Sequence, residues 1–192
     1  MLCSCYEAGA QTDHFKVQKL LKSLTLILGG ANSGKSRYAE SLLADSEGNR
    51  IYIATAEAYD DEMRQKIEAH RAMRGPLWET YEAPLALAET LREAPEGVPI
   101  LVDCVTLWLS NMLLAERAMD AEITALMEAL QSRNGAVVVV SNEVGLGVVP
   151  DTSLGRRFRS YQGALNQQIA AEAERVVAVM AGLPLALKGD LP

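Results

Sequence analysis

Short apolar runs alternate with longer amphipathic stretches along most of the chain, a pattern typical of an α/β protein. The runs that predict strands or extended segments are Leu24–Leu28, Arg50–Ala54, Trp78–Glu82, Val98–Asp103 and Ala136–Asn142. The last run is apolar on both faces, as expected of a parallel strand buried between two helix layers. Long connections separate the runs, so most of the strands should pair in parallel.

Stretches with apolar residues three or four positions apart predict helices between the strands. We expect one helix after Gly34 that ends around Ala44, and others over Asp60–Arg74, Pro84–Glu93, around Leu107–Leu113, and over Met119–Ser132. Leu85, Ala88 and Leu91 should share one face of the helix over Pro84–Glu93. A longer helix should carry one apolar stripe made of Leu154, Phe158, Tyr161, Leu165 and Ile169.

The end of the chain predicts a hairpin, because Val176–Met180 and Leu185–Leu187 flank Gly182-Leu183-Pro184. The fold should therefore be α/β with three layers, in which helices cover both faces of a mostly parallel central sheet. Residues 24–192 should form a single domain, since the 192-residue chain is long enough for one core. Residues 1–23 have no clear period and are expected to be a flexible extension.

The segment Gly29-Gly30-Ala31-Asn32-Ser33-Gly34-Lys35-Ser36 fits the P-loop pattern G-x-x-x-x-G-K-[ST], with a predicted strand before it and a predicted helix after it. Such a loop directs backbone N–H groups and the helix N-terminus at a phosphate. Lys35 would reach the outer phosphates, and the Ser36 hydroxyl would bind Mg²⁺. The motif predicts a P-loop NTPase-type fold that holds a nucleoside triphosphate.

Asp103 ends a buried strand run and would supply the carboxylate of the same magnesium site; an acid that only caps the next helix is the alternative. Ligands of parallel sheets bind at the carboxyl ends of the strands. That edge should collect the P-loop, residues 54–56, Asp103 and residues 142–143. A signalling GTPase is not indicated, because Asp103-Cys104-Val105-Thr106 is not D-x-x-G.

Charge and composition narrow the possible partners. Asp and Glu total 25 against 18 Lys and Arg, a net charge of -7, which argues against binding of nucleic acid. No apolar stretch is long enough to span a membrane and the first residues do not resemble a secretory signal, so we expect a cytoplasmic protein. Three cysteines do not suggest a disulfide framework, and Cys3, Cys5 and His14 match no common zinc pattern.

His70 is one of only two histidines and shares an apolar helix stripe with Met63 and Ile67. A histidine in such a place is usually a satisfied core or boundary residue. Arg71 and Arg74 nearby could instead hold an anion while a neutral imidazole attacks phosphorus. Position alone leaves both interpretations open. The arginines at 156, 157 and 159 are expected to form a solvated helix face without a role.

Several segments together resemble one known family: Gly29–Ser36, Tyr52–Ala56, Asp60–Met63, Ile67–Arg71, Trp78–Glu82 and Val140–Pro150. The order and spacing of these motifs resemble the bifunctional adenosylcobinamide kinase/adenosylcobinamide-phosphate guanylyltransferase family of cobalamin biosynthesis. The resemblance covers about residues 24–188. It implies phosphorylation of adenosylcobinamide with ATP or GTP, followed by transfer of GMP from GTP to adenosylcobinamide phosphate.

The resemblance also implies site residues. His70 matches the histidine that carries the guanylyl group in that family, with Lys35 as the second catalytic residue. The nucleotide contacts it implies are Gly29 to Ser36, Ala54, Thr55, Ala56, Arg71, Ala72, Met73, Arg74, Glu82 and Asp103, and the metal ligands are Ser36 and Asp103. Asn32 departs from an arginine common in the family, and similar proteins are homotrimers.

Two other classes of protein remain open on the residues alone. One is a P-loop kinase of another small metabolite in which His70 is structural, which would form no nucleotide–protein adduct. The other is a P-loop ATPase that works as a motor or regulatory module, which would bind or hydrolyse nucleotide without modifying a corrinoid. Formation of a guanylylated protein distinguishes both from the bifunctional enzyme.

Overall fold

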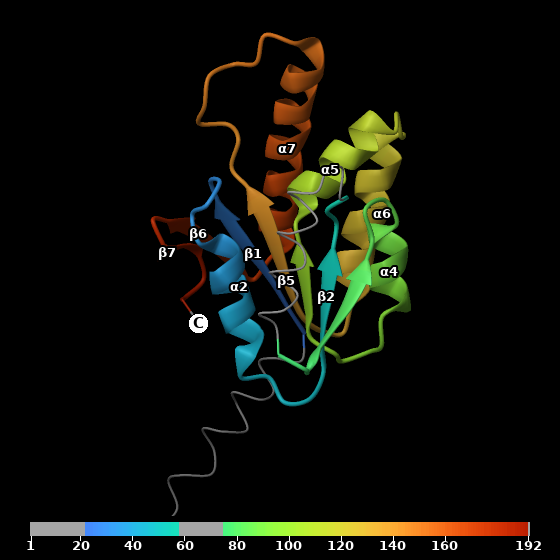
Figure 1. The fold of residues 1–192 in the computed structure, drawn as a ribbon, viewed down its shortest axis with the longest axis vertical. Coiled ribbons are helices and arrows are strands. Elements are labelled where there is room, and N and C mark those ends of the chain that lie inside the picture. The colour runs from blue at the N-terminus through green and yellow to red at the C-terminus, as the bar shows by residue number, and fades with distance from the viewer. Residues whose placement is uncertain (1–21, 58–74, 192) are drawn as a thin grey trace, which may run out of the picture.

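The computed structural model describes residues 22–57 and 75–191 (Figure 1). Helices and strands alternate there in the predicted order. They are β1 Lys22–Gly29, α2 Lys35–Ala44, β2 Arg50–Ala54, β3 Trp78–Glu82, α4 Leu87–Glu93, β4 Ile100–Asp103, α5 Val105–Leu114, α6 Met119–Ser132, β5 Gly135–Asn142, α7 Ser153–Glu172, β6 Arg175–Met180 and β7 Leu183–Lys188. The predicted helix over Asp60–Arg74 lies outside the described residues.

The seven strands of the described chain form one sheet in the order β3-β2-β4-β5-β1-β6-β7. All neighbours pair in parallel except β7, which pairs antiparallel with β6. Helix α2 packs on one face, against β1, β4, β5 and β6, and α4 to α7 cover the other face (Figure 1). The three-layer fold, the mostly parallel sheet and the C-terminal hairpin are therefore confirmed.

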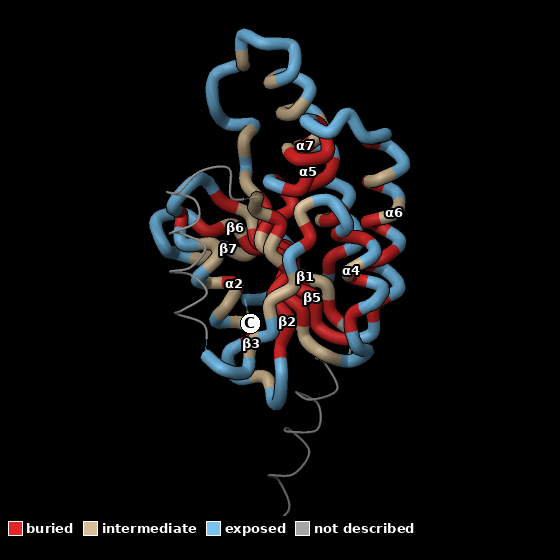
Figure 2. The backbone as a smooth tube through the Cα atoms, turned by 45° about the vertical axis from the view of Figure 1, so that its right-hand side comes forward, coloured by how far each residue is buried: buried red, intermediate tan, exposed pale blue. Residues whose placement is uncertain are grey.

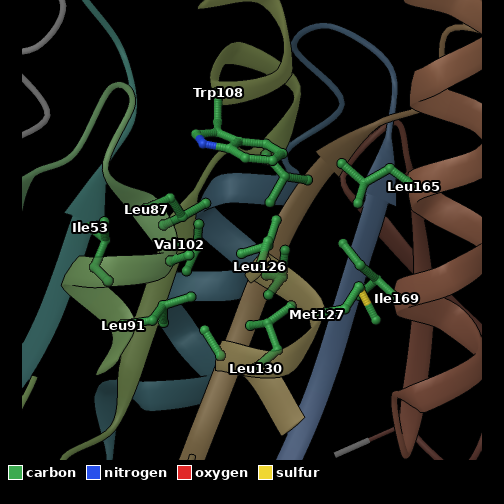
Figure 3. Close-up of a cluster of buried hydrophobic side chains, with 14 of the residues drawn as sticks. Ile53, Leu87, Leu91, Val102, Trp108, Leu126, Met127, Leu130, Leu165 and Ile169 are labelled. Carbon is green, nitrogen blue, oxygen red and sulfur yellow. The ribbon is translucent and has the colours of Figure 1, made fainter. Parts of the chain in front are cut away.

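Apolar side chains bury the two faces of the sheet in two clusters, and buried residues run along the central strands and the helices that pack on them (Figure 2). The larger cluster lies between the sheet and α4 to α7, where Trp108 packs among Val102 and Leu126 (Figure 3). The Trp108 indole N–H donates to the carbonyl oxygen of Leu85 at 3.2 Å, so this buried ring keeps a partner for its polar atom.

Helix α4 begins at Leu87, so the prediction that it starts at Pro84 is wrong. Its first hydrogen bond runs from the Thr90 N–H to the carbonyl of Ala86, while the Leu85 carbonyl accepts from Trp108 of α5. Because that carbonyl serves a tertiary contact, the chain stays outside the helix at Leu85. The Leu85 side chain is accordingly exposed, although Ala88 and Leu91 are buried as predicted.

Two further expectations are corrected at element ends. Strand β1 begins at Lys22 and β4 at Ile100, rather than at Leu24 and Val98. In α7 the predicted stripe is buried at Leu165 and Ile169 but exposed at Leu154, because the first turns of α7 extend past the sheet (Figure 1). The carboxyl ends of the parallel strands lie together below this projecting segment.

Candidate functional site

The P-loop joins β1 to α2 through a tight turn. Asn32 has φ 54° and Gly34 has φ 91°, so both lie in the left-handed region that asparagine and glycine tolerate best. The Ser33 N–H donates to Gly30 O at 3.3 Å, and the Gly182 N–H, from the turn between β6 and β7, donates to Ser33 O at 2.8 Å. The C-terminal hairpin therefore fixes the backbone of the P-loop.

Two glycines of the motif are required by close packing. A Cβ atom at Gly29 would lie 2.4 Å from Ser33 Oγ and 2.7 Å from Val179 O. A Cβ atom at Gly34 would lie 3.2 Å from the Cα atom of Gly182. The glycine spacing recognised in the sequence thus matches two positions where a side chain has no room.

The loop borders a cavity of about 510 Å³, within the range of small-molecule sites. It is lined by Asn32, Ser33, Gly34, Lys35, Ser36, Arg37, Glu40 and Gly182. The Lys35 ammonium donates to Gly30 O at 3.1 Å and so folds back over the loop. Helix α2 starts at Lys35, so its N-terminal N–H groups and the lysine charge favour an anion such as a phosphate.

Asp103, the last residue of β4, lies beside Ser36 in the first turn of α2. Ser36 Oγ donates to Asp103 Oδ1 at 3.4 Å, and Tyr52 Oη donates to Asp103 Oδ2 at 2.6 Å. A hydroxyl and a carboxylate are hard oxygen donors that suit Mg²⁺, which usually completes its shell with water and substrate phosphates. The residues present therefore fit a magnesium site of the kind predicted.

The strand register aligns other predicted residues with Asp103. Ala54 pairs with Glu82 on one side and with Asp103 on the other, which places these three in a row across β3, β2 and β4. Gly29 pairs with Asn142 across β1 and β5. The carboxyl edge of the sheet thus collects the described residues that sequence analysis assigned to it.

Thr55 stabilises this edge of the sheet by hydrogen bonds. Its hydroxyl donates to Cys104 O at 2.6 Å and accepts from the Cys104 N–H at 3.0 Å, and the Asn111 amide donates to Thr55 O at 2.9 Å. The bonds tie the end of β2 to the end of β4. Burial raises the pKa of the Cys104 thiol to about 11, so this thiol is protonated at neutral pH.

Sequence reasoning missed a buried polar network beneath the loop that follows β5. Ser141 Oγ donates to Asn166 Oδ1 at 2.6 Å, and Gln162 Nε2 donates to the same oxygen at 3.0 Å. Asn166 Nδ2 donates to Asn142 O at 3.1 Å, while the Asn142 N–H donates to Thr106 Oγ1 at 2.7 Å. The network fixes the end of β5. Gln162 and Asn166, two polar residues beside the apolar stripe of α7, were the sequence signal for this network.

Of the three arginines expected to form a solvated helix face, Arg156 and Arg157 are exposed, but Arg156 and Arg159 also bond to the loop before α7. Arg156 Nη1 donates to the carbonyls of Pro150 and Asp151, at 3.0 and 2.7 Å. Arg159 donates to Gly145 O. The two side chains brace the loop at 143–152 from α7, and the Glu143 N–H fixes the start of that loop to Gly29 O at 3.1 Å.

Some predicted residues lie outside the described part of the chain. They are His70, Arg71, Ala72, Met73 and Arg74, together with Cys3, Cys5 and His14. Among the described residues, no group of three or more His, Cys, Asp or Glu side chains could hold a metal ion by itself. A magnesium ion at Asp103 would thus depend on Ser36, water and phosphate oxygens for its other ligands.

Comparison with known proteins gives close sequence relatives. Residues 25–187 match the model of the family described as "Cobinamide kinase / cobinamide phosphate guanyltransferase". The bifunctional adenosylcobalamin biosynthesis protein CobP of Pseudomonas aeruginosa is 54% identical over 168 residues, which cover 86% of this chain and 97% of the relative. The bifunctional adenosylcobalamin biosynthesis protein CobU of Escherichia coli is 39% identical over 181 residues, 86% of this chain and 99% of the relative.

A solved structure supports the fold. The flagellar accessory protein FlaH of Methanocaldococcus jannaschii superposes with a TM-score of 0.51, at 13% identity, over 89% of this chain and 80% of that chain. At this identity the likeness bears on the fold alone. No helix in the described ranges is long and apolar enough to cross a membrane.

Proposed function

The chain belongs to the cobinamide kinase and cobinamide phosphate guanyltransferase family, and from this premise we propose how its residues perform the two reactions. The protein phosphorylates adenosylcobinamide with ATP or GTP, and then transfers GMP from GTP to the product. The observation that carries the assignment is the P-loop whose Ser36 hydroxyl lies 3.4 Å from the Asp103 carboxylate. A kinase needs these groups beside the transferred phosphoryl group.

In the kinase step the substrate hydroxyl attacks the γ-phosphorus and releases its proton, while the bond to the bridging β,γ-oxygen breaks and the nucleoside diphosphate leaves. Lys35 and the N-terminal N–H groups of α2 hold the phosphates and offset the charge that develops on them. Ser36 and Asp103 would hold Mg²⁺, which would neutralise phosphate charge. Ala54, Ala56 and Glu82 are proposed to contact the nucleotide from the adjacent strands. Thr55, predicted as a further contact, is fully buried and bonded to Cys104 and Asn111, so it supports this edge instead.

In the second step we assign the nucleophile to His70, on the strength of the family resemblance. A neutral imidazole nitrogen attacks the α-phosphorus of GTP, and the bond to the β-phosphate breaks with release of pyrophosphate. The phosphate of adenosylcobinamide phosphate then attacks the same phosphorus, the N–P bond breaks, and the imidazole is released. Residues 71–74 are proposed to hold the nucleotide during this step.

Incubation with Mg²⁺ and GTP labelled at the α-phosphate, followed by a denaturing gel, tests the second step. We expect an acid-labile label on the wild type and on His14→Ala, and none on His70→Ala, while His70→Ala keeps most of its kinase activity. His14 is the matched control because it is the other of the two histidines. Equal loss of both activities in folded His70→Ala would contradict the division of labour. Absence of label from the wild type would favour a kinase without guanylyl transfer.

We also propose that the protein assembles as a homotrimer, as the resemblance implies. Leu146 and Val148, on the braced loop that projects beyond the sheet, are 90% and 94% exposed, and exposed apolar side chains in a braced loop suit a protein interface. Mass determination by light scattering tests this, with a monomer as the contradicting result. The cytoplasmic location stays a prediction.

A further inference from the structure

Tyr52 places a hydroxyl group inside an otherwise apolar layer. It lies in β2, its side chain is buried, and its ring packs in the cluster beneath α2 with Leu43 and Leu101. The ring also makes an edge contact with Trp78, with centroids 6.3 Å apart and planes at 80°. Phenylalanine would satisfy all these apolar contacts, so packing alone does not explain the hydroxyl.

The Tyr52 hydroxyl is directed at the carboxylate that ends β4. It donates to Asp103 Oδ2 at 2.6 Å, the short distance typical of a hydroxyl that donates to an ionised carboxylate. The other oxygen, Asp103 Oδ1, lies 3.4 Å from Ser36 Oγ of the P-loop. The two carboxylate oxygens of Asp103 therefore have different partners. Oδ2 accepts from Tyr52 in the core, and Oδ1 faces Ser36 of the P-loop.

This division fixes the orientation of the carboxylate. The terminal torsion of an aspartate is broad, so an unrestrained carboxylate can rotate about it. The position of Tyr52 is itself fixed, because β2 pairs with β4 in a register that places Tyr52 beside Leu101 and Ala54 beside Asp103. A rigid phenol held in this way keeps Oδ1 facing the P-loop.

We propose that Tyr52 is a positioning residue for the magnesium ion of the nucleotide complex, acting through Asp103. The inference rests on the proposed function, in which Ser36 and Asp103 hold that ion. Groups that orient metal ligands typically change metal affinity by about 10- to 100-fold when they are removed. Loss of the hydroxyl should therefore raise the Mg²⁺ concentration needed for nucleotide binding by about tenfold.

The main readout is nucleotide binding rather than turnover. A fluorescent, non-hydrolysable GTP analogue is mixed at a fixed concentration with the full-length protein, and its binding is followed while Mg²⁺ is added. The proteins are the wild type, Tyr52→Phe, Asp103→Asn and Tyr38→Phe. Tyr38 is the matched control, because its ring packs from helix α2 against the same apolar cluster and its hydroxyl makes no hydrogen bond to any described residue.

We expect the Mg²⁺ midpoint to rise about tenfold in Tyr52→Phe and to stay within about twofold of the wild type in Tyr38→Phe. At saturating Mg²⁺ the kinase kcat of Tyr52→Phe should equal that of the wild type. A general loss of structure would instead lower kcat at every Mg²⁺ concentration. A thermal melt of each variant establishes that the folded proteins are compared.

Two results overturn the inference and can be told apart. If Asp103→Asn shifts the midpoint and Tyr52→Phe does not, Asp103 holds the metal without help from Tyr52. If neither variant shifts the midpoint, the magnesium site assigned in the proposed function is wrong, and the inference fails with it.

Discussion

Replacing Arg133 by methionine should lower the free energy of unfolding by about 3 kcal/mol and leave the nucleotide site intact. The Arg133 guanidinium is buried at the end of the sheet opposite the P-loop, just before β5. Its Nη1 donates to Ala94 O at 2.5 Å and its Nη2 donates to Pro95 O at 2.6 Å. These carbonyls lie at the C-terminus of α4, where a cation also complements the helix dipole.

The magnitude follows from these two short bonds. A hydrogen bond to a charged group contributes about 1.5–3 kcal/mol. We take the lower value for each, about 3 kcal/mol together, because methionine also removes the cost of burying the guanidinium charge. A third bond, to Leu91 O, is long at 3.4 Å, and the ion pair with Glu96 spans 4.0 Å to a side chain that is 67% exposed, so both add little.

Urea unfolding followed by circular dichroism measures the effect. With a slope of about 2 kcal/mol per molar urea, the midpoint should fall by about 1.5 M. Arg92→Met is the matched control: Arg92 donates to Ala125 O at 2.9 Å and lies 3.6 Å from Glu128, but its side chain is 43% exposed, so its loss should cost under about 1 kcal/mol. Equal midpoints for the two variants would refute the argument, as would a loss of kinase kcat in folded Arg133→Met.

Two further predictions concern the site. Gly34→Ala should weaken nucleotide binding at least about tenfold in calorimetry, because Gly34 has φ 91° and the new Cβ atom would lie 3.2 Å from the Cα atom of Gly182. Gly48→Ala is the control and should bind nucleotide normally: Gly48 also has a positive φ, 78°, but its new Cβ atom would meet no atom within 4 Å. Asn166→Leu should lower the free energy of unfolding by about 2–4 kcal/mol in urea, because Ser141, Gln162 and Asn142 each lose a hydrogen-bond partner. A loss under about 1 kcal/mol would mean that water replaces the amide.

The strands of the fold were predictable because their patterns are local. Residues 136–140 are apolar at every position, and β5 is buried along nearly its whole length, as a strand between two helix layers must be. The start of α4 was not predictable, since Leu85 fits the helical period but its carbonyl accepts from Trp108. That competing bond joins residues 23 positions apart, and local periodicity contains no information about it.

The candidate site likewise contains residues that the sequence reveals and residues that it does not. The P-loop glycines, Lys35 and Ser36 form a continuous motif whose spacing reflects the conformation of one short loop, so the sequence reveals them. Tyr52 is 51 residues from Asp103, and they meet only because β2 pairs with β4 in one register. Neither that strand order nor that register follows from the apolar pattern of β2, which is satisfied by phenylalanine as well as by tyrosine.

The two ends of the sheet explain why such residues gather where they do. At the amino end, two buried arginines satisfy carbonyls at helix C-termini, Arg50 those that follow α2 and Arg133 those that follow α4. At the carboxyl end, the sheet must hold a carboxylate, a loop and a phosphate cradle in fixed relation, which apolar packing cannot do because it is non-directional. Hydrogen bonds are directional, so Tyr52, Thr55 and Ser141 appear in buried positions there in spite of the cost of burying them. Polar residues in buried strands near their carboxyl ends are therefore a sequence signal that complements the P-loop motif.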